Sequence, residues 1–153
     1  MVQTQAFWKL LSIVVAASVV AGVVAALVAL ALVSSDDGLE GEVWVVDQLT
    51  IDGTSATPIP GTILTAVFED GVISGVAGCN DYFGGYVVDG GAIEVTEAGS
   101  TRAFCGEPAG TMDQEIAFLG LLQTADGFER DGEVLTLQAG DDPLIIFATR
   151  GDE

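Results

Sequence analysis

The chain has 153 residues, half of them hydrophobic, with 23 acidic residues against four basic ones, a length that suits one domain with an appendage. Such an acidic surface repels phosphate backbones, which excludes nucleic acid as a partner. The chain has no histidine, which excludes Ser-His-Asp and Cys-His catalysis as well as histidine-bound zinc.

The first predicted element is a membrane-spanning helix. Residues 10–33 read LLSIVVAASVVAGVVAALVALALV without a charged residue. A helix of this length crosses the hydrocarbon core of a bilayer, which is about 30 Å thick. Trp8 and Lys9 precede it and acidic residues follow it, so the positive-inside rule places residues 1–9 in the cytoplasm. We therefore predict a single-pass anchor in the cell membrane, with the rest of the chain on the extracytoplasmic side.

The alternative for this segment is a cleaved signal peptide. Its apolar core would normally be about 7–15 residues, shorter than this run. Ala29 and Ala31 nevertheless offer a small-x-small cleavage site. Both interpretations export the remainder of the chain.

Residues 34–41 predict a short linker, and residues 42–150 a single domain of short strands. Trp44 is the predicted core anchor of the first strand, and residues 53–61, with Pro58 and Pro60, predict a loop. Glycine-containing turn signals separate the later strands. The predicted strands are 42–47, 63–68, 72–75, 85–88, 92–95, 128–131, 134–138 and 144–149.

One helix is predicted at Met112–Leu122, where apolar residues recur at helical spacing. Met112, Ile116, Leu119 and Leu122 would share its buried face. Thr111 and Gln114 have the spacing of a capping box, and Asp113 and Glu115 fall in the first turn, where the helix dipole favours them. The fold class expected is α+β, with a mainly antiparallel, barrel-like sheet and one helix.

Cys79 and Cys105 are the two cysteines of the chain. Their spacing is too wide for a redox Cys-x-x-Cys pair. In an exported domain they predict a disulfide, which would stabilise the fold by roughly 3 kcal/mol. The alternative is a reactive thiol, for which Arg102 is the nearby cation.

The segment Ser74–Tyr86, SGVAGCNDYFGGY, resembles the sG-x-aGCN-x-y-x-G-x-Y signature of the META domain, the HslJ-like family. Thr101–Cys105 resembles the T-x-M-x-C element of that family, with Ala103 where methionine is usual. Trp44, the helix around Gln114–Leu122 and Leu135-Thr136-Leu137 fit its early tryptophan, helix and late strand. The resemblance covers Gly41–Thr149.

This resemblance implies a META-type barrel without established enzyme activity. The family includes a heat-inducible bacterial lipoprotein linked to novobiocin resistance and trypanosomatid proteins linked to virulence. Its fold is similar to that of a lipid-binding pilot protein for secretin assembly. The resemblance therefore implies a non-catalytic domain of the cell envelope with a role in stress tolerance. This chain differs in having an apolar span in place of a lipid-modified cysteine.

The residues of the family motif have a structural and a functional interpretation. In the structural one, the glycines allow tight turns and close strand approach, Asn80 can tolerate a left-handed backbone and bond its own loop, and the tyrosines enter the core. In the functional one, they form a recognition loop that the disulfide makes rigid. The motif residues are Trp44, Gly75, Gly78, Cys79, Asn80, Tyr82, Gly84, Tyr86, Thr101 and Cys105.

Three functions follow as hypotheses. The first is non-catalytic binding of an envelope protein or a small ligand by the membrane-anchored domain. The second is a lipid- or hydrophobe-binding module with a cavity in a partly open barrel. The third is a hydrolase that pairs Asp81 with Glu107 or Asp113.

The acidic residues are scattered, so the sequence predicts no metal site and no cofactor. Asn80-Asp81 and Asp141-Asp142 could contribute oxygen ligands to calcium but lack an ordered ligand series. The excess of acid serves solubility or adaptation to salt, or it attracts a basic partner or cations.

Overall fold

A computed structural model describes residues 38–149, within the second of two compact units, Asp36–Glu153. The predicted anchor at 10–33 and the residues before it lie outside the described part of the chain, as does the cleavage site of the alternative interpretation. Between residues 38 and 149, no helix is long and apolar enough to cross a membrane.

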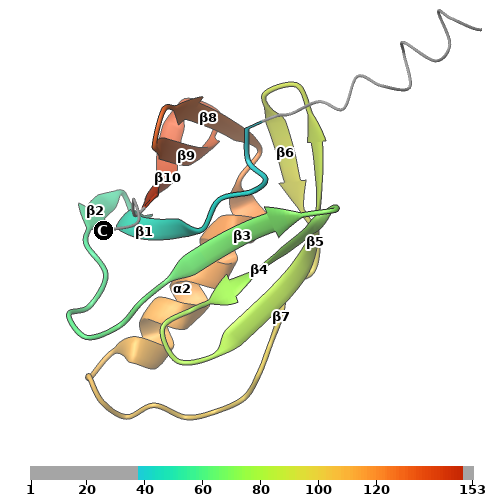
Figure 1. Cartoon of the computed structure of the whole chain (residues 1–153). Coiled ribbons are helices and arrows are strands. Elements are labelled where there is room, and N and C mark those ends of the chain that lie inside the picture. The colour runs from blue at the N-terminus through green and yellow to red at the C-terminus, as the bar shows by residue number, and fades with distance from the viewer. Residues whose placement is uncertain (1–37, 150–153) are drawn as a thin grey trace, which may run out of the picture. The chain divides into compact units, whose positions relative to one another are not determined.

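The described residues form ten strands and one helix (Figure 1). The elements are β1 (Trp44–Ile51), β2 (Thr54–Ala56), β3 (Thr65–Glu69), β4 (Val72–Val76), β5 (Asp81–Asp89), β6 (Ala92–Val95), β7 (Gly99–Ser100), α2 (Thr111–Thr124), β8 (Gly127–Asp131), β9 (Val134–Ala139) and β10 (Asp142–Thr149).

Eight of these strands close into an antiparallel barrel. Their order is β10-β9-β8-β6-β5-β4-β3-β1, and β1 pairs again with β10 to close the ring. β2 extends the sheet beside the end of β1, and β7 pairs with β5. The prediction of a mainly antiparallel, barrel-like sheet with one helix is confirmed, and the barrel is closed.

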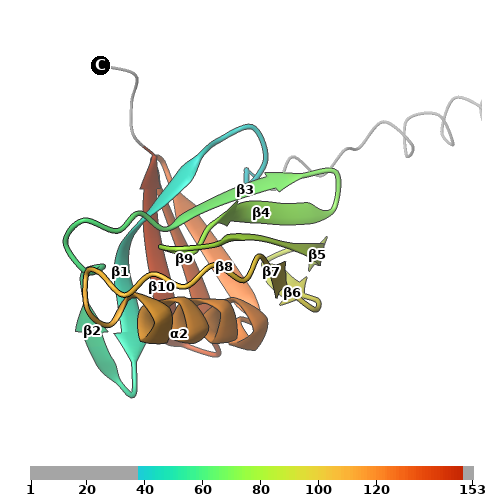
Figure 2. The same cartoon turned by 90° about the horizontal axis from the view of Figure 1, so that it is seen from below.

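β1 has β10 on one side and both β3 and β2 on the other, and its pairing with β10 contains a β-bulge between Val46 and Gln48. Before the bulge, Trp44 and Val45 pair with β3, and beyond it Leu49 to Ile51 pair with β2. The bulge bends the strand at that point, as bulges do at barrel corners. The last residues of β1 form a hairpin with β2, which Figure 2 shows beside α2.

Two short strands were missed by the sequence analysis. β2 lies in the predicted loop 53–61, and β7 lies in a stretch given no structure. β1 also continues four residues past its predicted end at Asp47. The signal for the first hairpin is Asp52-Gly53, whose φ angles of 50° and 72° suit a type I′ turn. Asp70-Gly71, predicted as the turn between β3 and β4, has the same geometry.

Large side chains fill the barrel interior. Trp44 is fully buried, as predicted, and its indole Nε1 donates to the Leu39 carbonyl at 2.9 Å. The Arg130 guanidinium lies over the indole ring, 5.1 Å from its centroid. The largest fully buried side chains are Trp44, Tyr82, Phe68, Phe118, Phe147, Leu39, Leu64, Ile73, Leu122, Leu135, Leu137 and Ile145. This packing supports a solid core in place of the cavity that the hydrophobe-binding hypothesis expected inside the barrel.

Helix α2 runs from the side of β2 to that of β6, and it contacts β6 and β10 (Figure 2). Its existence was predicted, and Leu122 is buried as predicted, with Leu119 packed against the core, but the prediction for Ile116 was wrong. Ile116, expected in the core, is 70% exposed, while Gln114 and Glu115 are buried with Phe118 and Leu122. The reason is tertiary, because two polar side chains on this face find buried hydrogen-bond partners in loops of the barrel.

The predicted capping box is also wrong. The residue at the N-cap is Gly110, with φ 89°, and no side chain caps the helix. The Thr111 hydroxyl donates to the Pro108 carbonyl at 2.7 Å, and Gln114 reaches away from the helix. Thr111 therefore bonds the connection that precedes the helix, and Gln114 bonds Ile59 in the loop between β2 and β3.

Candidate functional site

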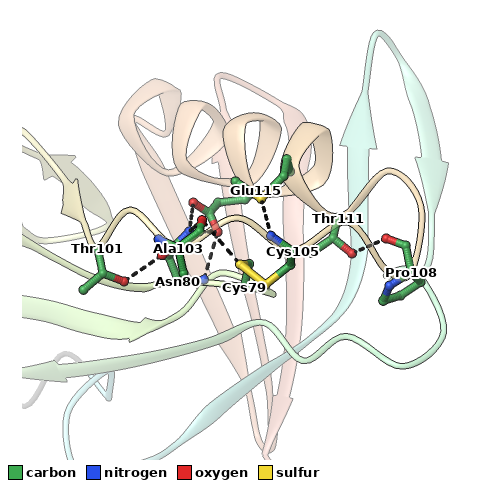
Figure 3. The surroundings of a disulfide bond; sticks show 9 residues. Cys79, Asn80, Thr101, Ala103, Cys105, Pro108, Thr111 and Glu115 are labelled. Carbon is green, nitrogen blue, oxygen red and sulfur yellow. Dashed lines mark hydrogen bonds between the residues drawn. A yellow bond between two sulfur atoms is a disulfide. The ribbon is translucent and has the colours of Figure 1, made fainter.

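A disulfide joins Cys79, which follows β4, to Cys105 in the connection before α2, with a Cα–Cα distance of 5.9 Å (Figure 3). The predicted pairing is confirmed. The bond fastens the β4–β5 loop to residues 101–105, which follow β7 and belong to no strand, although the Thr101 N–H donates to the Asp81 carbonyl of β5 at 3.0 Å.

Asn80, the next residue, is the hub of a buried hydrogen-bond network (Figure 3). Its amide Nδ2 donates to the Glu115 carboxylate at 3.0 Å and to the Ala103 carbonyl at 3.1 Å. Its Oδ1 accepts from the Thr101 hydroxyl at 2.8 Å and from the Ala103 N–H at 2.7 Å. Each polar atom of this side chain is thus engaged within the fold, so it offers nothing to a calcium ion.

Glu115 joins the helix to this network. Its Oε2 accepts the backbone N–H of Asn80 at 2.9 Å, in addition to the side-chain amide. The carboxyl group is buried, and these donors take the place of water around its oxygens. We name the group of Cys79, Asn80, Ala103, Cys105 and Glu115 the disulfide clamp, because it holds the β4–β5 loop, residues 101–105 and α2 together.

Asn80 does not use the left-handed backbone that an asparagine can tolerate. Among residues 38–149, the non-glycine residues with positive φ are Asp52 and Asp70. The Asn80 carbonyl does accept from Ala77 within its own loop, at 2.8 Å, but its side chain bonds other segments. The sequence analysis therefore gave the right residue a local role where the structure gives it a long-range one.

Two motif glycines stand where no side chain fits. A Cβ on Gly75 would lie 2.1 Å from the Thr65 carbonyl oxygen on β3, well inside van der Waals contact. Gly78 has φ 99°, in the left-handed region that only glycine enters without strain. A Cβ on Gly84 would lie 3.0 Å from the Thr96 carbonyl oxygen.

The two motif tyrosines lie in the core, as expected. Tyr82 packs edge to face on Phe118 of α2, and its hydroxyl donates to the Thr65 carbonyl at 2.8 Å. Burial raises the pKa of Tyr82 above its ordinary value. The Tyr86 hydroxyl donates to the Glu40 carboxylate at 2.7 Å. These contacts support the structural interpretation of the motif.

The structure also contains a small cleft that the sequence did not predict. It has a volume of about 290 Å³ and lies between the β1–β2 hairpin and the first half of α2. We name it the hairpin–helix cleft. Its walls are mainly apolar and come from Leu49, Ile51, Ala56, Ile59 and Ala117. Asp113, which is exposed, is the charged residue that lines it.

Gln114 fixes the wall of this cleft. Its Oε1 accepts the Ile59 backbone N–H at 2.6 Å, and its Nε2 donates to the Thr62 hydroxyl at 2.9 Å. A helix residue thus holds the loop between β2 and β3 in place.

Two larger clefts, of about 460 and 540 Å³, open beside β6 and beside the start of β10, with a larger polar share in their walls.

The carboxylates proposed for hydrolysis lie on separate elements. Asp81 begins β5, Glu107 belongs to the connection before α2, and Asp113 lies in the first turn of the helix. All three are exposed, and the clamp uses none of them. Within residues 38–149, no three Cys, Asp or Glu side chains gather closely enough to hold a metal ion.

Comparison with known proteins agrees with the resemblance seen in the sequence. Three solved structures share the fold, among them an NMR structure of a protein from Burkholderia xenovorans with 25% identity, a TM-score of 0.62, and coverage of 77% of this chain and 88% of that one. A crystal structure of a DUF4847 family protein from Bacteroides vulgatus has 16% identity and a TM-score of 0.56, over 78% of this chain and 100% of that one. No curated protein matches the chain. The META domain family matches residues 37–151, and the chain therefore belongs to that family.

Proposed function

We propose that this protein is a non-catalytic binding domain on the extracytoplasmic side of the cell membrane, held there by the apolar segment 10–33. The observation that carries the binding role is the hairpin–helix cleft. Binding sites are concave, mostly apolar and largely formed before the ligand arrives, with few polar groups. The Gln114 hydrogen bonds to Ile59 and Thr62 support a preformed site of this kind.

The disulfide supports the predicted location. Such bonds persist in oxidising compartments and are rare in the cytosol. The test combines thiol labelling and protease treatment of intact cells that express the full chain. We expect external protease to cut the domain, and Cys79 and Cys105 to resist labelling until they are reduced. A domain that is protected from protease, with thiols that label freely, would reverse the proposed topology.

The role in stress tolerance that the resemblance to the META family implies is tested separately. Cells without the gene should lose viability under heat or envelope stress, and the full-length chain should restore it. A chain with Ala117→Glu, which places a charge in the hairpin–helix cleft, should fail to restore viability although it is made and exported. Equal restoration by both chains would separate the stress role from the cleft.

The apolar walls also favour a second candidate, the binding of a hydrophobe at the hairpin–helix cleft outside the barrel. A fluorescent long-chain fatty acid should then bind the full chain in nanodiscs more strongly than it binds empty nanodiscs. Ala117→Glu should abolish the difference. Equal signals from loaded and empty nanodiscs would eliminate this candidate.

A further inference from the structure

We infer that β2 is a docking edge for an extended segment of another polypeptide, which places an apolar side chain in the hairpin–helix cleft and a lysine or arginine beside Asp113. This inference rests on the proposed binding function and names the class of its partner.

The first argument is an open strand edge. Within the described residues, β2 pairs with β1 alone, and its three residues are all exposed. In a two-residue type I′ hairpin, Ile51 and Thr54 form the hydrogen-bonded pair next to the turn. The following pair, Thr50 and Ser55, is therefore not hydrogen-bonded, and the N–H and C=O of Ser55 point away from β1. An added strand bonds to groups placed in this way.

The second argument is register. Leu49, Ile51 and Ala56 occupy alternate positions of the hairpin, so they share one of its faces, and all three line the cleft. A segment paired to the outer edge of β2 presents every second side chain on that same face. Backbone pairing and filling of the cleft are therefore satisfied by one binding mode.

The third argument is charge. Asp113 lines the cleft and Asp52 stands at the tip of the hairpin, and both are exposed. The cations of residues 38–149 are Arg102 and Arg130, and neither lines the cleft. Arg130 is already held over Trp44 and beside Glu42, 3.9 Å from its carboxylate. The electrostatic potential at the cleft is therefore negative, which favours a cationic side chain on the partner.

The cleft volume and the edge length fit a polypeptide. About 290 Å³ holds one large apolar side chain, and three residues of edge give few backbone hydrogen bonds. Recognition of this kind combines main-chain pairing with a side-chain pocket. Each contact is modest, so the partner should exchange readily.

The test uses the full chain in nanodiscs of neutral phosphatidylcholine and a displayed library of random twelve-residue peptides. The peptides enriched over empty nanodiscs are synthesised, and their affinities are measured by fluorescence anisotropy. Ala117→Glu is compared with Ile116→Glu, which introduces the same charge one residue earlier, on the exposed side of α2. Asp113→Lys is the second cleft variant, in case Ala117→Glu lowers the melting temperature.

We expect enriched peptides to combine aromatic or aliphatic residues with lysine or arginine. Ala117→Glu should weaken binding at least about tenfold, Asp113→Lys about threefold to tenfold, and Ile116→Glu less than about twofold. N-methylation of single peptide amides should weaken binding at the residue that pairs with Ser55 and not at its two neighbours, because alternate N–H groups face the strand edge. Three results would each overturn the inference: no enrichment, equal loss with Ile116→Glu, or no alternation among the N-methylated peptides.

The fatty-acid measurement separates this inference from the proposed function. If peptides fail and the fatty acid binds in a manner that Ala117→Glu abolishes, the cleft is a binding site and the polypeptide partner is wrong. If neither probe binds the full chain, both the inference and the binding function fail.

Discussion

Asn80 holds three parts of the chain together through one buried side chain. Its amide group bonds Glu115 on α2 and the segment around Ala103, while its backbone stays in the β4–β5 loop. A buried polar network that is fully satisfied fixes one arrangement of its elements, since any other leaves polar groups unpaired. The contacts of Asn80 within the fold thus account for this residue of the family motif.

Asn80→Ala should destabilise the protein by about 3 kcal/mol or more, because it leaves the Glu115 carboxylate buried with a backbone partner alone. Urea unfolding of the full chain measures this cost. The double variant Asn80→Ala with Glu115→Ala should lose less than the sum of the two single losses. A loss below about 1 kcal/mol for Asn80→Ala would contradict the role given to the network.

Gly75 and Gly120 form a matched pair for testing close approach. Gly75→Ala should destabilise by about 3 kcal/mol or more, because its Cβ meets backbone at 2.1 Å. Gly120→Ala should stabilise by about 0.5–1 kcal/mol, because nothing lies within 4 Å and alanine favours the helix. The two melting temperatures should therefore move in opposite directions, and a common direction would refute the argument.

Tyr82 predicts an alkaline limit to stability. Burial raises its pKa in the folded state, while the unfolded chain ionises near its ordinary value of about 10. Below that value the Tyr82 hydroxyl is protonated in both the folded and the unfolded state, so its contribution to stability is fully present. Above it the unfolded state alone ionises, and stability should fall by up to about 1.4 kcal/mol per pH unit. Tyr82→Phe should remove this slope from the unfolding free energy between pH 10 and 11, and an unchanged slope would exclude Tyr82 as its source.

At the scale of elements, the connection between β7 and α2 depends on the clamp. Residues 101–105 belong to no strand, and they are held by the disulfide, by Asn80 and by the hydrogen bond from the Thr101 N–H to the Asp81 carbonyl of β5. Helix α2 is tied to the same place through Glu115 and to the β2–β3 loop through Gln114. The helix is therefore joined to the barrel by these loop contacts as well as by the packing of Phe118 and Leu122 in the core.

Removal of the disulfide with Cys79→Ser and Cys105→Ser should cost about 3 to 4 kcal/mol, the loop-closure value for its separation of 26 residues. The measurement is denaturant unfolding of the full chain. Reductant should lower the unfolding free energy of the wild type by this same amount. It should leave the double variant unaffected. A shift of the variant with reductant would indicate another cause.

At the scale of the molecule, the charge of the chain opposes the compact state. Residues 38–149 contain two arginines among many carboxylates, and one ion pair at 3.9 Å is found among them. Repulsion between such surface charges is screened by salt, with a Debye length of about 10 Å at 0.1 M. The excess of acid is tolerated because most of it is exposed.

Raising NaCl from 20 mM to 300 mM should therefore stabilise the full chain by about 1 kcal/mol, or about 4 °C in melting temperature. Sucrose at equal osmolarity should have a smaller effect, because it does not screen charge. A melting temperature that stays constant or falls with salt would mean that self-repulsion is unimportant here.

Local sequence determined the parts of this protein that depend on near neighbours. Strand alternation and Asp-Gly or Gly-Gly turns were enough for the β3–β4, β5–β6 and β8–β9 hairpins, because turn geometry is set within a few residues. The core position of Trp44, the pairing of the two cysteines and the family signature could also be identified from the sequence. The acidic composition, with 23 acidic residues against four basic ones, was also available from the sequence, because it does not depend on any fold.

The tertiary structure decided what depends on segments far apart in the chain. Glu115 lies 35 residues from Asn80, and Gln114 lies 55 from Ile59, so neither bond leaves a local signal, and the helix face was misjudged for that reason. Closure of the barrel through β1 and β10 and the hairpin–helix cleft have the same origin. Periodicity records which residues are apolar, whereas a buried polar face exists only once distant partners are in place.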